Sequence, residues 1–269
     1  MPPPRLALVA LLALALPAAA GDLPLLPEQP PPVPLQPAWA AAGRPVVVIL
    51  PDHLGRDARV GFHAEALLAQ GLAVLAIDLP AAEGIELGDR LRPRPPDPAE
   101  AAPALLPGLL ALLRQLSTGE GQPRPVGVLG FGTGGEAALL AAQADRAGPR
   151  FAAHAALYPT CASAALRRDR LAGAPTSGAP LLLIIPHGGG AGDMPGGCAR
   201  LYLPSGAPGR DPVTLHGYDS LGYGFDLWPA VAWATGDAGF DPLRFDALRA
   251  RLARREIAAF FAAALAAPR

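Results

Sequence analysis

Short apolar runs alternate with longer Ala- and Leu-rich segments over most of this chain, and this alternation constrains its fold more than any other feature. The runs expected to form strands are Pro45–Leu50, Leu72–Asp78, Val126–Gly130, Phe151–Tyr158, Leu181–Pro186 and Val213–His216. The segments expected to form helices are Phe62–Gln70, Pro98–Leu116, Thr133–Ala147, a stretch around Gly197–Leu203, and Asp241–Ala267. Each crossover is long enough to return the chain in the parallel direction. The sequence therefore predicts an α/β fold with a doubly wound, mainly parallel sheet of about six strands and helices on both faces.

The first 44 residues do not follow this alternation. An apolar run over residues 6–16 follows a single positive charge, and small residues that end in an Ala-x-Ala pattern precede Gly21. This combination predicts a signal peptide over residues 1–20 and a protein that is periplasmic or secreted, because a membrane span needs roughly 20 apolar residues. Residues 21–44 are dense in proline, which predicts an extended arm. Residues 45–269 are then expected to form one domain.

The charge balance narrows the classes of partner. The chain has 22 basic and 23 acidic residues and a net charge of -1, with no basic run interleaved with aromatic residues. We therefore expect no nucleic-acid partner, and no membrane span in the mature form. The pairs Asp219/Asp226 and Glu83/Glu86 lack the spacing of a metal site, so neither a metal nor a cofactor is predicted. The expected partner is a small molecule in a cleft at the carboxyl ends of the strands.

The chain has two cysteines, Cys161 and Cys198. In an oxidising compartment, an even pair far apart in sequence predicts one structural disulfide. Two buried free thiols are the alternative, because the sequence does not supply the Cα separation that a bridge needs.

Residues 126–138 contain a strand, a tight glycine-rich turn and the start of a helix. This is the local pattern of a nucleophile elbow, in which small residues stand two positions before and two positions after the nucleophile. A larger side chain at either place would collide with neighbouring backbone. Gly130 and Gly134 fit the two small positions, so the nucleophile position falls on Gly132.

Three segments carry a resemblance to a known family. Residues 130–135, Gly-Phe-Gly-Thr-Gly-Gly, resemble the elbow Gly-Phe-Cys-x-Gly-Gly of the dienelactone hydrolases. Residues 158–161 resemble the Tyr-Pro-x-Cys of exported relatives, and residues 218–226 resemble Tyr-Pro-Gly-Ala-x-His-Gly-Phe-Asp. The resemblance runs from Pro45 to the C-terminus, and it implies an α/β-hydrolase fold and descent from a carboxylic ester or lactone hydrolase.

Carried over position by position, the resemblance implies a degenerate catalytic triad. The nucleophile falls on Gly132, which has no side chain, and the family's histidine falls on Tyr223. A phenol with a reference pKa near 10 is a poor general base at neutral pH. The acid would fall on Asp193, where the loop is shorter than in the family. We therefore favour a catalytically impaired member that acts as a ligand- or partner-binding pseudoenzyme.

The backbone donors for an oxyanion remain in this assignment. They would be the amide of Thr133 and an amide of His53 or Leu54. One alternative is an active esterase or lactonase that uses non-standard residues, with Thr133 as nucleophile and His53 or His187 as base. A Thr133 nucleophile would place Phe131 where the turn needs a small side chain, so we expect the Thr133 hydroxyl to cap the helix instead.

A second alternative is nucleotide binding. Gly130, Gly132 and Gly135 also satisfy the Gly-x-Gly-x-x-Gly fingerprint of dinucleotide-binding folds. That fingerprint requires an acidic residue about 20 positions later, at the end of the next strand, to hold the ribose. The next strand ends in Ala156-Leu157-Tyr158-Pro159-Thr160, which contains no acid, so this alternative is disfavoured.

Overall fold

The computed structural model describes residues 43–53, 55, 57–77, 98–118, 124–143, 148–159, 161, 177–187, 213–219, 222–227 and 245–266. Several predictions lie outside these residues. They are the signal peptide over residues 1–20, almost all of the arm over residues 21–44, the helix around Gly197–Leu203, Leu54, Asp193 and Cys198.

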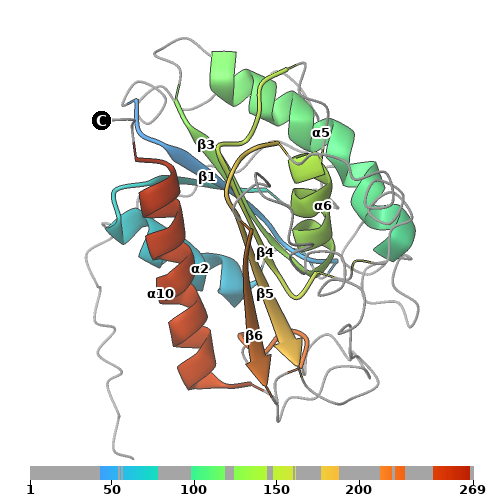
Figure 1. Ribbon diagram of the computed structural model, residues 1–269, viewed down its shortest axis with the longest axis vertical. Helices are drawn as coiled ribbons and strands as arrows, with labels where there is room; N and C mark the ends of the chain where they lie inside the picture. Colours follow the sequence, from blue (N-terminus) through green and yellow to red (C-terminus); the bar gives the residue numbers. More distant parts are fainter. Residues whose placement is uncertain are drawn as a thin grey trace, which may run out of the picture.

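A six-stranded parallel sheet forms the centre of the described structure (Figure 1). Its strands are β1 (Val46–Leu50), β2 (Ala73–Ala76), β3 (Val126–Phe131), β4 (Ala153–Leu157), β5 (Leu181–His187) and β6 (Val213–Asp219). The spatial order is β2-β1-β3-β4-β5-β6, so the chain reverses its direction of winding after β2. The prediction of a doubly wound parallel sheet is therefore confirmed.

Helices cover both faces of the sheet, as the alternating pattern predicts (Figure 1). The helices α2 (Ala58–Ala69) and α10 (Ala247–Ala264) pack on one face, against side chains that include Val47 and Ile49. The helices α5 (Pro98–Thr118) and α6 (Gly132–Gln143) pack on the other face, against Val46, Val48 and Leu50. Successive side chains of β1 thus point to opposite faces, and every residue of β1 is buried. No described helix meets the length and hydropathy needed to cross a membrane.

Helix boundaries differ from the sequence prediction where a side-chain cap decides them. Helix α2 begins at Ala58, four residues before the predicted start, because the side chain of Asp57 accepts a hydrogen bond from the amide of Arg59. Helix α10 begins at Ala247 because Asp246 accepts hydrogen bonds from the amides of residues 248 and 249. Both predictions rested on hydrophobic periodicity, which does not detect a cap.

The carboxyl ends of β1, β3 and β4 meet at one edge of the sheet. Asp52 follows β1, Gly132 follows β3, and Tyr158 follows β4. The turn over residues 222–227, which comes after β6, contributes Tyr223 and Asp226 to the same region. This edge is where open parallel sheets carry their binding and catalytic groups.

Candidate functional site

The turn between β3 and α6 has the close packing that the elbow pattern predicts. A Cβ atom on Gly130 would lie 2.1 Å from the carbonyl oxygen of Gly134, and a Cβ on Gly134 would lie 2.4 Å from the carbonyl oxygen of Pro51. Only glycine therefore fits at these two positions without a shift of the backbone. Between them, Gly132 has a φ of +50°, which lies in the left-handed region that side chains disfavour.

The side chain of Tyr223 lies directly above Gly132. A Cβ atom on Gly132 would lie 2.0 Å from the Tyr223 hydroxyl oxygen and 2.9 Å from its Cζ atom. The same Cβ would lie 3.0 Å from the Cβ of Asp52. Tyr223 therefore fills the space in which a side chain at position 132 would begin.

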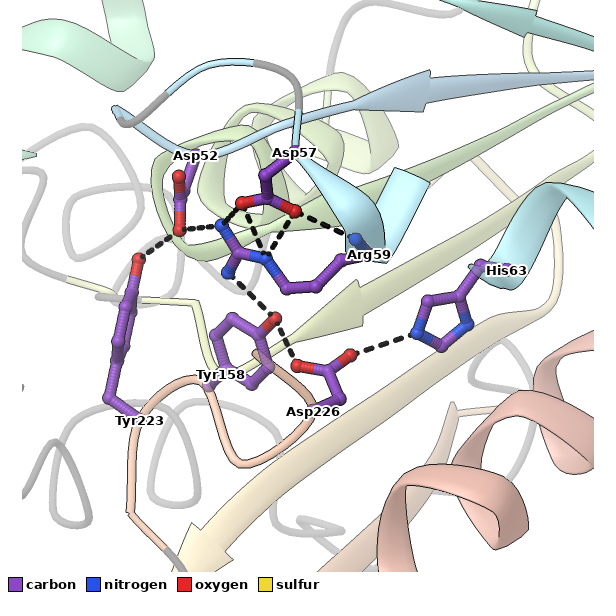
Figure 2. A network of polar contacts seen from close by, with 7 residues as sticks. All are labelled: Asp52, Asp57, Arg59, His63, Tyr158, Tyr223 and Asp226. Carbon is purple, nitrogen blue, oxygen red and sulfur yellow. Dashed lines mark hydrogen bonds and ion pairs between the residues drawn. The ribbon is translucent and has the colours of Figure 1, made fainter. Parts of the chain in front are cut away.

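The Tyr223 hydroxyl donates a hydrogen bond of 3.1 Å to Oδ2 of Asp52 (Figure 2). The same Oδ2 lies 2.8 Å from Nη2 of Arg59, and both Asp52 and Arg59 are only 1% exposed. Arg59 belongs to the first turn of α2, so the capping of that helix positions the cation beside the elbow. The start of α2 and the end of β1 are thus joined by the buried ion pair between Arg59 and Asp52.

Arg59 is the centre of the polar network in Figure 2. Its Nε donates to both carboxylate oxygens of Asp57, at 3.0 and 2.9 Å, and its Nη1 donates to the Tyr158 hydroxyl at 3.1 Å. Burial alone would lower the pKa of the Arg59 guanidinium, but the charge of Asp52, supported by Tyr158 and Asp57, raises it well above its usual value. Arg59 therefore carries its positive charge inside the protein.

The network continues from Tyr158 to α2. Tyr158 donates a hydrogen bond of 2.7 Å to Oδ1 of Asp226, and Oδ2 of Asp226 lies 2.8 Å from Nε2 of His63. Burial would raise the pKa of Asp226, but the hydrogen bond and charge of His63 and the charge of Arg59 lower it below its usual value. Asp226 is therefore ionised at neutral pH. Burial raises the pKa of Tyr158 well above its usual value, so this phenol keeps its proton and donates it.

The structure brings some of the predicted site residues together. Gly132 and Tyr223 are in contact, and Thr133 follows Gly132 in the first turn of α6 with 6% of its surface exposed. The amide of Thr133 is among the helical donors that have no intrahelical acceptor. His53 is partly exposed, directly after Asp52, and His187 ends β5 in register with Asp219.

Sequence reasoning did not select Asp52, Arg59 or Tyr158 as site residues, and it considered Asp226 as a possible metal ligand and as the last position of the resemblance over residues 218–226. Asp52 and Tyr158 could have been found, because each follows a predicted strand at the carboxyl edge of the sheet. Arg59 gave no such signal, since its position beside Asp52 depends on the packing of α2 against the sheet.

Among the described residues, no cluster of three or more potential ligand side chains could hold a metal.

Cys161 is buried, and no described cysteine is free. Cys198 lies outside the described residues, so a bridge between these two cysteines stays a prediction.

Comparison with known proteins agrees with this architecture. The sequence model of the dienelactone hydrolase family matches residues 33–186, which is more than half of the chain. No curated protein matches the sequence.

Two solved structures are among those similar to this chain. One is described as a candidate dienelactone hydrolase from Klebsiella pneumoniae; it has 14% sequence identity and a TM-score of 0.54, and the match covers 82% of this chain and 88% of that one. The other is P91, described as a dienelactone hydrolase-like promiscuous phosphotriesterase from metagenomic libraries, with 17% identity, a TM-score of 0.49 and coverage of 82% and 86%. Together with the parallel sheet, the first likeness shows the α/β-hydrolase fold.

Proposed function

We propose that this chain, which belongs to the dienelactone hydrolase family, no longer turns over esters by the family's nucleophile and histidine and instead binds a ligand as a pseudoenzyme. The observation that carries this proposal is the contact between Tyr223 and Gly132. The Tyr223 hydroxyl lies 2.0 Å from the place of a Cβ at position 132, which supports a site without a nucleophilic side chain at that position.

Two changes act together against hydrolysis. Gly132 offers no nucleophilic atom, and Tyr223 offers a phenol whose reference pKa near 10 leaves it protonated at neutral pH. Removal of triad members typically lowers kcat by several orders of magnitude, and the members act as a unit. The buried network then keeps the vacated site ordered, because Asp52, Arg59 and Tyr223 each have a partner in it.

The expected ligand is a small molecule with a carbonyl group, bound at the carboxyl edge of the sheet. The amide of Thr133 supports this choice, since the first turn of α6 carries backbone donors and the positive end of the helix dipole.

The nucleotide-binding alternative finds less support. The Tyr223 side chain fills the space above Gly132, where the fingerprint needs a close approach of a pyrophosphate. The residue that follows β4 is Tyr158 and not an acid, and its hydroxyl donates to Asp226 inside the protein.

An active esterase built on Thr133 with His53 or His187 is the competing function, and steady-state kinetics decide between the two. The substrates are 4-nitrophenyl acetate and a dienelactone, and the proteins are the mature wild type, Gly132→Ser, Tyr223→His and the double variant. We expect no sustained turnover by the wild type. The double variant should be faster than either single variant, because nucleophile and base depend on each other. Robust wild-type turnover that Thr133→Val or His187→Ala abolishes would overturn the proposal.

The cellular location is a separate proposal. The N-terminal pattern supports export and a mature N-terminus near Gly21. Fractionation followed by N-terminal sequencing checks it, and a cytosolic protein that keeps Met1 would refute it.

The bridge between Cys161 and Cys198 is proposed on the same ground, since export places both cysteines in an oxidising compartment. Thiol counting on the denatured, non-reduced protein should find none free. Two reactive thiols would contradict the bridge.

A further inference from the structure

The position of the Tyr223 hydroxyl oxygen suggests a chemical role for this side chain. It is 2.0 Å from the position of a Cβ on Gly132, and a nucleophilic atom on that Cβ would lie one single bond, roughly 1.5 Å, beyond it. The hydroxyl oxygen of Tyr223 thus lies near the place that a nucleophile at position 132 would occupy. We propose that Tyr223 accepts one acyl group from activated esters and keeps it, which makes the bound state of this pseudoenzyme covalent.

The surroundings of the hydroxyl suit this step (Figure 2). Its proton points to Oδ2 of Asp52 at 3.1 Å, so a proton acceptor is already hydrogen-bonded to the attacking group. Asp52 is held in turn by Arg59 at 2.8 Å, and Arg59 is held by Asp57 and Tyr158. Tyr223 itself is partly exposed, in contrast to Asp52 and Arg59, which are only 1% exposed.

The acylation step balances with groups present at the site. The Tyr223 oxygen attacks the carbonyl carbon while its proton passes to Asp52, and the carbonyl oxygen becomes an oxyanion, for which the amide of Thr133 in the first turn of α6 is the proposed donor. The carbon–oxygen bond to the leaving group then breaks, and the leaving group departs as an anion or takes the proton from Asp52. The products are an ester of Tyr223 and the free leaving group, with no oxidant or cofactor required.

Two features select the donor and stop the reaction at this stage. Transfer to a phenol with a pKa near 10 is favourable only when the leaving group is a weaker base, which selects aryl esters and related activated acyl donors. Hydrolysis of the acyl group would need a water activated by a base, but the family's histidine position is Tyr223 itself, and Asp52 is only 1% exposed. The inference rests on the proposed function, since an enzyme with turnover would not retain the acyl group.

The experiment follows nitrophenolate release from 4-nitrophenyl acetate by the mature protein, together with intact-mass and peptide analysis. The chain contains no lysine, so the usual competing acceptor is absent. We expect about one equivalent of nitrophenolate per chain and then a plateau. The intact mass should increase by one acetyl group, and the acetyl group should map to Tyr223.

Matched variants separate the roles of the residues. Tyr223→Phe should lose the burst, whereas Tyr218→Phe should keep it, because Tyr218 bonds to Glu256 and burial raises its pKa to about 12. Asp52→Asn should slow the burst by about 100-fold through loss of the proton acceptor. Thermal unfolding of each variant identifies any that fails to fold. If Asp52→Asn fails to fold, the comparison of Tyr223→Phe with Tyr218→Phe still tests the proposal.

The outcomes distinguish this inference from the function on which it rests. A burst that maps to Tyr223 supports it. The absence of both burst and turnover overturns the covalent step and leaves the proposed pseudoenzyme standing. A label that persists in Tyr223→Phe also overturns the step, because another group then accepts the acyl group. Sustained turnover by the wild type overturns the proposed function and this inference together.

Discussion

Nη2 of Arg59 lies 2.8 Å from Oδ2 of Asp52, and each residue is only 1% exposed. A buried pair of this kind gains less stability than its short distance suggests, because both charges lose their hydration. The main effect of Arg59 is to position its partners, since a single guanidinium contacts Asp52, Asp57 and Tyr158 and holds them in one arrangement. That arrangement holds the acceptor to which the Tyr223 hydroxyl donates.

We predict that Arg59→Met lowers the free energy of unfolding by about 3–5 kcal/mol, because it leaves the buried Asp52 carboxylate without its cation. Urea titration of purified protein measures the loss. The control is Glu65→Ala on α2, whose exposed carboxylate pairs with Arg254 of α10 and should contribute less than about 1 kcal/mol. Equal losses in the two variants would show that the buried network does not stabilise the fold.

Gly132 and Tyr223 should show strong thermodynamic coupling. Gly132→Ala places a Cβ 2.0 Å from the Tyr223 hydroxyl oxygen and a side chain at a φ of +50°, so it should be destabilising on its own. Adding Tyr223→Ala removes the collision. In a double-mutant cycle, the double variant should therefore be about 1–3 kcal/mol more stable than the sum of the single effects predicts. Additive effects would mean that the two residues are not in contact in solution.

The elbow should tolerate no side chain at its flanking glycines. Gly130→Ala would put a Cβ 2.1 Å from the carbonyl oxygen of Gly134, and we expect a loss of about 1–3 kcal/mol or more. Gly61 lies within α2 and has no neighbouring atom within 4 Å of an added Cβ. Gly61→Ala should therefore stabilise the protein by about 0.5–1 kcal/mol. Thermal unfolding compares the two, and the prediction is wrong if Gly130→Ala unfolds at or above the wild-type temperature.

His154 on β4 should make stability fall in mild acid. Burial lowers its pKa from 6.5 to about 3, and the nearby Pro180 backbone opposes this only in part. Above pH 6.5 both the folded and unfolded states are neutral at this residue. As the pH falls from 6.5 towards 3, only the unfolded state takes up the proton, so the free energy of unfolding falls by up to about 1.4 kcal/mol per pH unit.

The variant His154→Leu tests this effect. Neither ring nitrogen of His154 makes a well-formed hydrogen bond, so an apolar residue should cost little at neutral pH. Urea titrations between pH 7 and pH 4.5 should show a shallower loss in the variant than in the wild type. Between pH 7 and pH 8 the difference between the two proteins should stay constant. Parallel curves down to pH 4.5 would rule out His154 as the source.

The sequence alone determined the architecture of this protein, and the physical reason is local. Runs such as Val46–Leu50 are apolar throughout and can be buried on both faces only in a parallel sheet covered by helices. The glycines at 130 and 134 likewise indicated a turn with no room for side chains, and the packing around them agrees. The same local pattern placed glycine at the position where the resemblance expects a nucleophile.

Only the tertiary structure decided what surrounds that position. Tyr223 is 91 positions after Gly132, and Asp52 is 80 positions before it, so no periodicity or spacing could place the tyrosine hydroxyl above the turn and beside the carboxylate. Arg59 donates a hydrogen bond to Tyr158, 99 positions away, because side chains of α2 pack in the same core cluster as the end of β4. Hydrogen bonds and ion pairs act over a few ångströms in space, whatever the separation along the chain. The polar network at the elbow therefore became visible only once the strands were set side by side.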